Sequence, residues 1–149
     1  TFISPGQDSR LDKVRIKLNP IREEVAGKRV MIIDDSIVRG TTSGQIVKLL
    51  RDAGAIEVHM RISAPPFMNP CYYGTDIDSW ENLIACHHFV DEIADIIGAD
   101  SLGFLPEEEL RSLVGCDEYC HACFSGEYPT EIPAAPMKNR FETKISENN

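Results

Sequence analysis

The spacing of apolar and polar residues changes several times between residues 29 and 114, and each change marks a predicted element. Residues 29–33 form a short β-branched apolar run, which predicts a strand buried on both faces. Apolar residues then repeat at helical spacing, with Thr42 and Gln45 as a predicted capping box and Gly54 as the stop. Alternation over residues 56–62 predicts a second strand that is half-buried.

The alternation of strands and helices continues toward the C-terminus. Apolar residues at helical spacing over 90–97 predict an amphipathic helix that ends at Gly98. Residues 102–105 predict a short strand, and a helix is predicted from Pro106 through residue 114. Strand, helix and strand in succession favour right-handed parallel crossovers. The predicted fold class is therefore α/β, a mainly parallel sheet with helices on both faces.

The length of 149 residues and the distribution of apolar positions predict one domain followed by a tail. The predicted domain covers residues 1–123. Within it, residues 1–27 are polar and Pro-punctuated, which is typical of a solvated segment or of a loop that closes over an anionic ligand. Residues 124–149 have little periodicity and are predicted to be an extension that wraps a partner surface or stays disordered. Because the chain starts at Thr1 without a signal sequence, we expect it to be N-terminally truncated.

Charge and hydropathy exclude two classes of partner. The formal net charge is -9, whereas a nucleic-acid binder gathers Lys and Arg on one face. The longest apolar runs are far shorter than a membrane span, so no membrane segment is expected. Any phosphate that the chain binds must be held locally, by backbone N–H groups at a helix start or by a bound divalent cation.

The most informative stretch follows the first predicted strand. Two acids stand where that strand ends, and ligands of open α/β sheets bind at this edge. The Gly-Thr-Thr-Ser turn after them offers close backbone approach, hydroxyls and helix N–H groups to a phosphate. The acids would cap the strand, bind sugar hydroxyls or hold Mg²⁺. The predicted binding residues are Asp34, Asp35, Ser36, Ile37, Val38, Arg39, Gly40, Thr41, Thr42 and Ser43.

The cysteines form a second candidate site. Three of the five lie within eight positions, which suits a metal or a cluster better than a secreted disulfide framework and indicates the reducing cytoplasm. Cys120 and Cys123 form a C-x-x-C pair, whose spacing suits Zn²⁺, an iron–sulfur cluster or a redox dithiol. His121 between them is a further candidate zinc ligand. Cys86 is predicted to be a small buried residue.

One of these motifs resembles a known family. The segment Asp-Asp-Ser-Ile-Val-Arg-Gly-Thr-Thr-Ser resembles the phosphoribosylpyrophosphate (PRPP) motif of type I phosphoribosyltransferases. Its residue sequence is similar to that of the glutamine PRPP amidotransferases in particular. Residues 17–20, 69–74 and 126–130 also resemble that family, so the likeness covers most of residues 1–132. It implies a type I phosphoribosyltransferase fold, represented here by its C-terminal part.

The resemblance also implies a reaction. Ammonia derived from glutamine would displace pyrophosphate from PRPP and give phosphoribosylamine, the first step of de novo purine nucleotide synthesis. Asp34 and Asp35 would be the catalytic pair and would contact Mg²⁺ and the ribose hydroxyls, while residues 36–43 would wrap the 5′-phosphate. Residues 1–20 would match the loop that closes over substrate and excludes water. Catalysis would rest on positioning and on charge neutralisation.

Further implications concern the cofactor and the partners. Some members of the family hold a structural [4Fe–4S] cluster, and Cys71, Cys120 and Cys123 stand at the matching positions. The fourth ligand would precede residue 1. Cys116 is nearby and could substitute for it, although the resemblance does not assign Cys116 that role. The family hydrolyses glutamine in a separate N-terminal domain with an N-terminal Cys nucleophile, and no Cys precedes Cys71 here. Homo-oligomers and feedback inhibition by purine nucleotides are also implied.

Three other interpretations stay open at this point. A phosphoribosyltransferase that loads a purine or pyrimidine base would need the same loop. A non-catalytic PRPP-binding regulator would also keep the loop, although it would not need the cysteines or the Gly-Glu-Tyr-Pro-Thr segment. An inactive fragment is the third interpretation, because the early strands of the fold would lie upstream.

Overall fold

A computed structural model describes residues 18–75, 77, 79–115 and 119–132. Most of the predicted closing loop, together with Cys116 and residues 133–149, therefore lies outside the described part of the chain. Its elements follow one another as strands and helices in alternation, as the sequence predicted. No helix of the described residues has the length and apolar character needed to cross a membrane.

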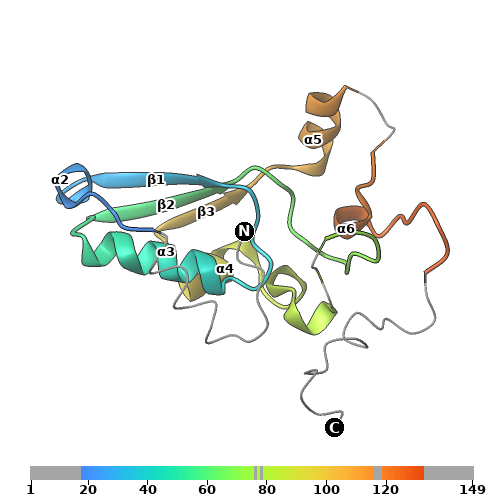
Figure 1. Ribbon diagram of the computed structural model, residues 1–149, viewed down its shortest axis with the longest axis horizontal. Coiled ribbons are helices and arrows are strands. Elements are labelled where there is room, and N and C mark those ends of the chain that lie inside the picture. The colour runs from blue at the N-terminus through green and yellow to red at the C-terminus, as the bar shows by residue number, and fades with distance from the viewer. Residues whose placement is uncertain (1–17, 76, 78, 116–118, 133–149) are drawn as a thin grey trace, which may run out of the picture.

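Three parallel strands form the sheet (Figure 1). They are β1 (Arg29–Asp34), β2 (Glu57–Ile62) and β3 (Ser101–Phe104), in the order β1-β2-β3. Strand β1 pairs with the whole of β2, whereas β3 pairs only with the last four residues of β2, from His59↔Ser101 to Ile62↔Phe104. The predicted positions of all three strands are confirmed to within one residue at each end.

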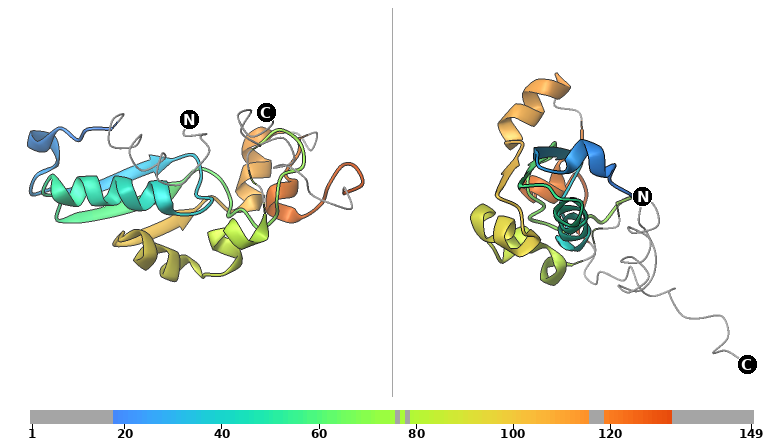
Figure 2. Two further views of the ribbon diagram at one scale, coloured as in Figure 1. Left: turned by 60° about the horizontal axis from the view of Figure 1, so that its bottom comes forward. Right: turned by 90° about the vertical axis from the view of Figure 1, so that its left-hand side faces the viewer.

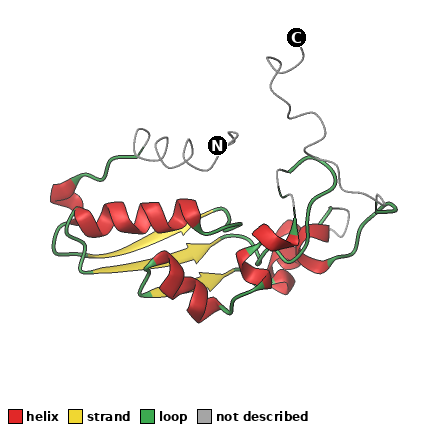
Figure 3. Ribbon diagram, turned by 90° about the horizontal axis from the view of Figure 1, so that it is seen from below, coloured by secondary structure: helices red, strands yellow, loops and turns green. Residues whose placement is uncertain are grey.

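The helices that pack on the sheet are α3 (Thr41–Asp52) and α4 (Val90–Ile97). Both lie on the same face, as the view from below shows (Figure 3). The expectation of helices on both faces is thus not met in the described residues. The reason is topological: the strand order advances in one direction, and right-handed crossovers that advance in one direction place their helices on one side.

The remaining helices are short and lie at the ends of the sheet. Helix α2 (Arg22–Val25) precedes β1, and the 3₁₀ helices η1 (Trp80–Asn82) and η2 (Ile84–Cys86) precede α4. Helices α5 (Glu107–Val114) and α6 (Ala122–Ser125) follow β3. Figure 2 shows that α5 and α6 lie beyond the carboxyl ends of the strands, at the same end of the molecule as η1 and η2.

Two details of the predicted elements are wrong. Strand β1 is partly buried on one face and exposed on the other: Met31 and Ile33 are 61% and 76% exposed, because no described helix covers their side of the sheet. Helix α3 begins one residue earlier than the predicted cap, and its N-cap is Gly40, with no side-chain cap bond. The Thr42–Gln45 capping box therefore does not form, because both residues already lie inside the helix.

Two hydrophobic cores support the structure. The main core fills the space between the sheet and helices α3 and α4, with Val58, Met60 and Ile62 of β2 at its centre. The second core lies beyond the carboxyl ends of the strands, around Phe67, Ile77 and Leu83. Partly buried residues from three segments pack against this second core: Val38, Cys71, Cys86, Cys123 and Phe124.

The described part of the C-terminal extension folds back onto the second core. Met68 and Asn69 donate backbone hydrogen bonds to the carbonyl of Cys123, at 2.9 and 3.0 Å. The Tyr128 hydroxyl donates to the carbonyl of Pro70 at 2.7 Å, and the Tyr128 ring contacts that of Tyr72. Residues 124–130 therefore pack on the loop that contains Cys71.

Candidate phosphate site and cysteine segment

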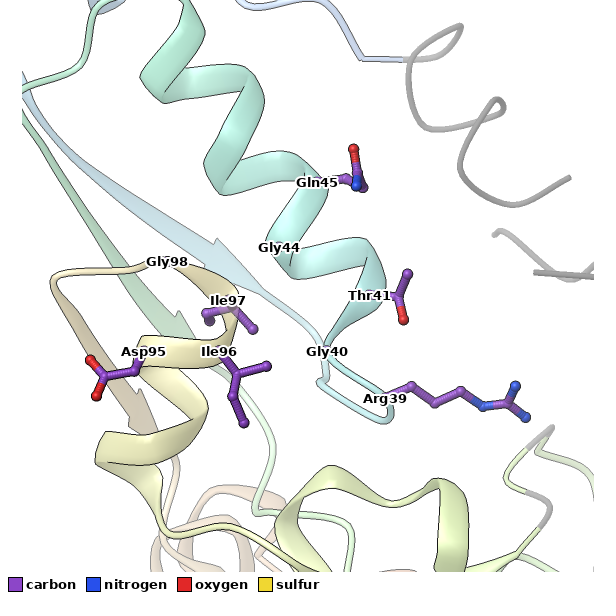
Figure 4. A pocket seen from close by; sticks show the side chains of 9 residues that line it. All are labelled: Arg39, Gly40, Thr41, Gly44, Gln45, Asp95, Ile96, Ile97 and Gly98. Carbon is purple, nitrogen blue, oxygen red and sulfur yellow. The ribbon is translucent and has the colours of Figure 1, made fainter. Parts of the chain in front are cut away.

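The predicted phosphate loop lies at the carboxyl edge of the sheet, between the end of β1 and the first turn of α3 (Figure 4). Gly40 has a φ of 77°, a left-handed conformation that glycine adopts at little cost. A Cβ at this position would lie 2.9 Å from Ile84 Cδ1, so the packing also leaves no room for a side chain at residue 40. The absence of a side-chain cap at Gly40 leaves the first N–H groups of α3 available to an anion.

The two acids stand at the entrance of this loop. The Asp35 N–H donates to Asp34 Oδ1 at 3.0 Å, and the Ser36 hydroxyl donates to Asp35 Oδ1 at 2.9 Å. Burial raises the pKa of Asp34; the Asp35 N–H bond opposes this effect, and the neighbouring Asp35 carboxylate adds to it. A divalent cation would offset both the burial and the repulsion. Two adjacent carboxylates beside a phosphate cradle are the donor set that Mg²⁺ takes in such sites.

A shallow cavity of about 390 Å³ adjoins the loop. Of the predicted binding residues, Arg39, Gly40 and Thr41 line it, whereas Asp34 and Asp35 do not. The other lining residues come from the second turn of α3 and the end of α4: Gly44, Gln45, Asp95, Ile96, Ile97 and Gly98. Sequence reasoning missed these residues, because α4 approaches α3 only through the tertiary fold.

The cavity therefore covers one part of the predicted site. In Figure 4 the Arg39 side chain extends away from α4. The Asp95 side chain lies on the side of α4 that faces away from Arg39. The predicted phosphate contacts would come from the N–H groups of Gly40 and the start of α3 rather than from this cavity. Ser43, the last predicted residue, is only 3% exposed, so it contributes to packing more than to an open surface.

Of the three predicted cluster ligands, Cys71 and Cys123 pack against the second core, whereas Cys120 is exposed. Burial acts to raise the pKa of Cys71, but N–H groups of residues 73–75 and the Thr75 hydroxyl outweigh it, so the pKa is lowered. Burial raises the pKa of Cys123 to about 11, with further contributions from the charges of Cys71 and Cys120. All four described cysteines are free thiols.

The cysteine segment has some features of a cluster site. Hydrogen bonds from backbone N–H groups to a sulfur are typical of iron–sulfur ligands, and a bound metal would favour the thiolate that burial disfavours at Cys123. Within the described residues, however, no three His, Cys, Asp or Glu side chains converge as a metal-binding group. The predicted ligand set of Cys71, Cys120 and Cys123 remains a prediction.

His121 lies beside a carboxylate. Its Nδ1 lies 3.1 Å from Glu107 Oε1 of α5, without the alignment of a hydrogen bond. The side chain is largely buried, and its ring contacts that of Tyr119. This contact joins α5 to the segment between Cys120 and Cys123.

Comparison with known proteins gives consistent matches. No family model matches the chain. The chain is 54% identical over 140 residues to the chloroplastic amidophosphoribosyltransferase of Glycine max, and 52% identical over 137 residues to the amidophosphoribosyltransferase of Archaeoglobus fulgidus. These alignments cover 93% and 89% of the chain, but only 25% and 30% of the two relatives. The chain therefore spans between a quarter and a third of their length.

Solved structures agree with these relatives. The glutamine PRPP amidotransferase of B. subtilis, complexed with ADP and GMP, superposes with a TM-score of 0.74 at 52% identity. That match covers 91% of this chain and 31% of the other. A structure described as the allosteric regulatory enzyme of purine biosynthesis also gives a TM-score of 0.74, at 53% identity. The fold is thus that of the phosphoribosyltransferase part of these proteins.

Proposed function

Since the chain is homologous to a C-terminal portion of the amidophosphoribosyltransferases, we propose that it forms the PRPP-binding part of such an enzyme. In the proposed reaction, ammonia from glutamine displaces pyrophosphate from PRPP and gives phosphoribosylamine, which starts purine nucleotide synthesis. The single observation that carries the proposal is the loop at the end of β1. There, two acids precede a left-handed Gly40 and an uncapped helix start.

The loop would act by binding and charge stabilisation. The N–H groups after Val38 and at the start of α3, with the hydroxyls of Thr41 and Thr42, would hold the 5′-phosphate. The carboxylates of Asp34 and Asp35 would accept hydrogen bonds from the ribose hydroxyls and would bind Mg²⁺. When bound, Mg²⁺ would neutralise charge on the departing pyrophosphate. Little acid–base chemistry is needed, because ammonia attacks a centre that the departing pyrophosphate leaves electron-poor.

Exclusion of water is the second requirement, since water competes with ammonia for the same carbon. We assign this task to residues 1–27, the predicted closing loop. Glutamine hydrolysis is assigned to sequence outside these 149 residues. Two further proposals follow from the family: purine nucleotides would act as feedback inhibitors, and copies of the chain would assemble as a homo-oligomer in the cytoplasm.

The cysteine segment would hold a [4Fe–4S] cluster in this proposal. Cys71, Cys120 and Cys123 would be three of its ligands, with a fourth from outside the described residues. The N–H bonds to Cys71 and the effect of the Cys71 and Cys120 charges on Cys123 support it. The role of the cluster would be structural, because Cys71 and Cys123 pack against the second core rather than in the loop.

A calorimetric titration tests the proposal. PRPP with Mg²⁺ is added to the anaerobically purified chain and to the Asp34→Asn/Asp35→Asn variant, after both are shown to be folded by circular dichroism. Saturable binding that the double variant loses is the expected result, and ammonia-dependent pyrophosphate release is then measured. Equal binding by both proteins would show that Asp34 and Asp35 do not contribute to PRPP binding. Release of pyrophosphate with a purine or pyrimidine base, but not with ammonia, would instead indicate a base phosphoribosyltransferase.

A further inference from the structure

Two pairs of adjacent apolar residues, one in the phosphate loop and one in a segment distant in sequence, lie close together. The first pair, Ile37 and Val38, belongs to the loop itself, and the second pair, Leu83 and Ile84, lies where η1 meets η2. In each pair the isoleucine is buried in the main core, while the other residue lies in or against the second core. Both pairs thus stand where the two cores meet.

A backbone hydrogen bond joins these pairs. The Ile84 N–H donates to the carbonyl of Val38 at 2.9 Å. This bond holds a loop residue to a segment that is distant in sequence. Because Leu83 is fully buried and Ile84 is only 8% exposed, the segment that donates the bond is itself fixed by packing.

The side chain of Ile84 reaches the same loop at a second point. Its Cδ1 lies 2.9 Å from the position that a Cβ on Gly40 would occupy, and Ile97 Cγ2 lies 3.4 Å from that position. Ile84 therefore contacts the loop through its backbone at Val38 and through its terminal methyl beside Gly40. Gly40 is the N-cap of α3, so its placement sets the direction of the first N–H groups of that helix.

We infer that Ile84 is a positioning residue for the phosphate loop. It contacts no ligand, and it acts by holding residues 38–40 in the shape that receives the 5′-phosphate. The inference rests on the proposed function, since it assumes that this loop binds PRPP. An ordinary core residue would stabilise the fold without changing the affinity of the folded protein.

A pair of matched variants separates these two roles. Ile84→Val deletes only the terminal methyl beside Gly40 and keeps the N–H bond to Val38. Ile93→Val deletes the same methyl from a residue of α4 that is buried in the same core and 1% exposed. Affinity for PRPP with Mg²⁺ is measured by calorimetry on each folded 149-residue chain, and ribose 5-phosphate serves as a second probe of the 5′-phosphate contacts. Urea midpoints report stability.

Ile84→Val is expected to weaken PRPP binding about tenfold, equivalent to about 1.4 kcal/mol, and to weaken ribose 5-phosphate binding by the same factor. Ile93→Val is expected to bind both probes as the unaltered chain does, although its urea midpoint also falls. If Ile84→Val does not fold, Ile84→Leu preserves the buried volume, moves the terminal methyl, and is expected to show the same loss.

The outcomes distinguish this inference from the proposed function. No saturable binding of PRPP by the unaltered chain would overturn the proposed function, and the inference with it. Normal binding by the unaltered chain together with equal affinities for the Ile84 and Ile93 variants would overturn the inference alone. Ile84 would then be a core residue like its neighbours.

Discussion

Replacing Gly40 with alanine would test two separate constraints on the phosphate loop. The first is conformational, because φ is 77° at this position, and a residue with a Cβ adopts this left-handed conformation at a cost of about 1–2 kcal/mol. The second is steric, because the new Cβ would lie 2.9 Å from Ile84 Cδ1. Ile84 is buried, so relief of this contact requires core side chains to shift, at about 1 kcal/mol or more.

Gly27 provides a matched control for the first constraint. Its φ is 72°, but nothing lies within 4 Å of the position of an added Cβ. Both substitutions also restrict the unfolded chain by the same amount, so this contribution cancels in the difference. Gly40→Ala should therefore lower the free energy of unfolding by about 1 kcal/mol more than Gly27→Ala does. Urea unfolding followed by circular dichroism measures this difference.

A double variant isolates the contact itself. Ile84→Val removes the atom that the alanine would strike, so Gly40→Ala should cost less in that background, with a coupling energy of about 1 kcal/mol. Equal costs for the Gly40 and Gly27 substitutions, or additive effects of the Gly40 and Ile84 substitutions, would refute the steric argument. The loop would then be held by the left-handed backbone alone.

Three more predictions concern other parts of the molecule. The pKa of Asp100 is lowered, first by a hydrogen bond from the Val58 N–H and then by Arg51, so its ionised form stabilises the fold above the ordinary carboxyl pKa of 3.8. The stability difference between the unaltered chain and Asp100→Asn should be constant at neutral pH and should be lost as the pH falls below 3.8. Urea midpoints at several pH values measure this difference. Tyr128→Phe removes the bond to the Pro70 carbonyl and should cost about 1 kcal/mol of unfolding free energy. Anaerobic reconstitution with iron and sulfide should give visible absorbance that Cys123→Ser loses, and equal absorbance in both proteins would exclude this ligand.

The elements of the sheet could be predicted because each leaves a periodic signal. Alternation placed β2, and helical spacing ended by Gly98 placed α4. The apolar run of β1 was misread, because such a run does not reveal whether both faces are covered, and Met31 and Ile33 are exposed. The start of α3 was misplaced because the capping-box pattern favoured Thr42 as the cap, whereas the helix begins at Thr41 with Gly40 as its N-cap.

The candidate residues of the loop could be picked out from the sequence, but the contacts that support the loop could not. Asp34 and Gly40 stand out because acids at a strand end and a glycine before a helix have local meanings. The sequence around Ile84 has no comparable local signal. It lies in a segment of short 3₁₀ turns without periodicity, and its contacts with the loop exist only after the chain folds.

The parallel topology explains why these features gather at one end. Three parallel strands place their carboxyl ends at the same edge, so the segments that follow them must meet there. The loop follows β1, the segment with Cys71 and Ile84 follows β2, and the segment with Cys123 follows β3. Val38 packs against the core that the last two segments build. The predicted phosphate loop, residues 34–43, therefore packs against side chains that follow the other two strands.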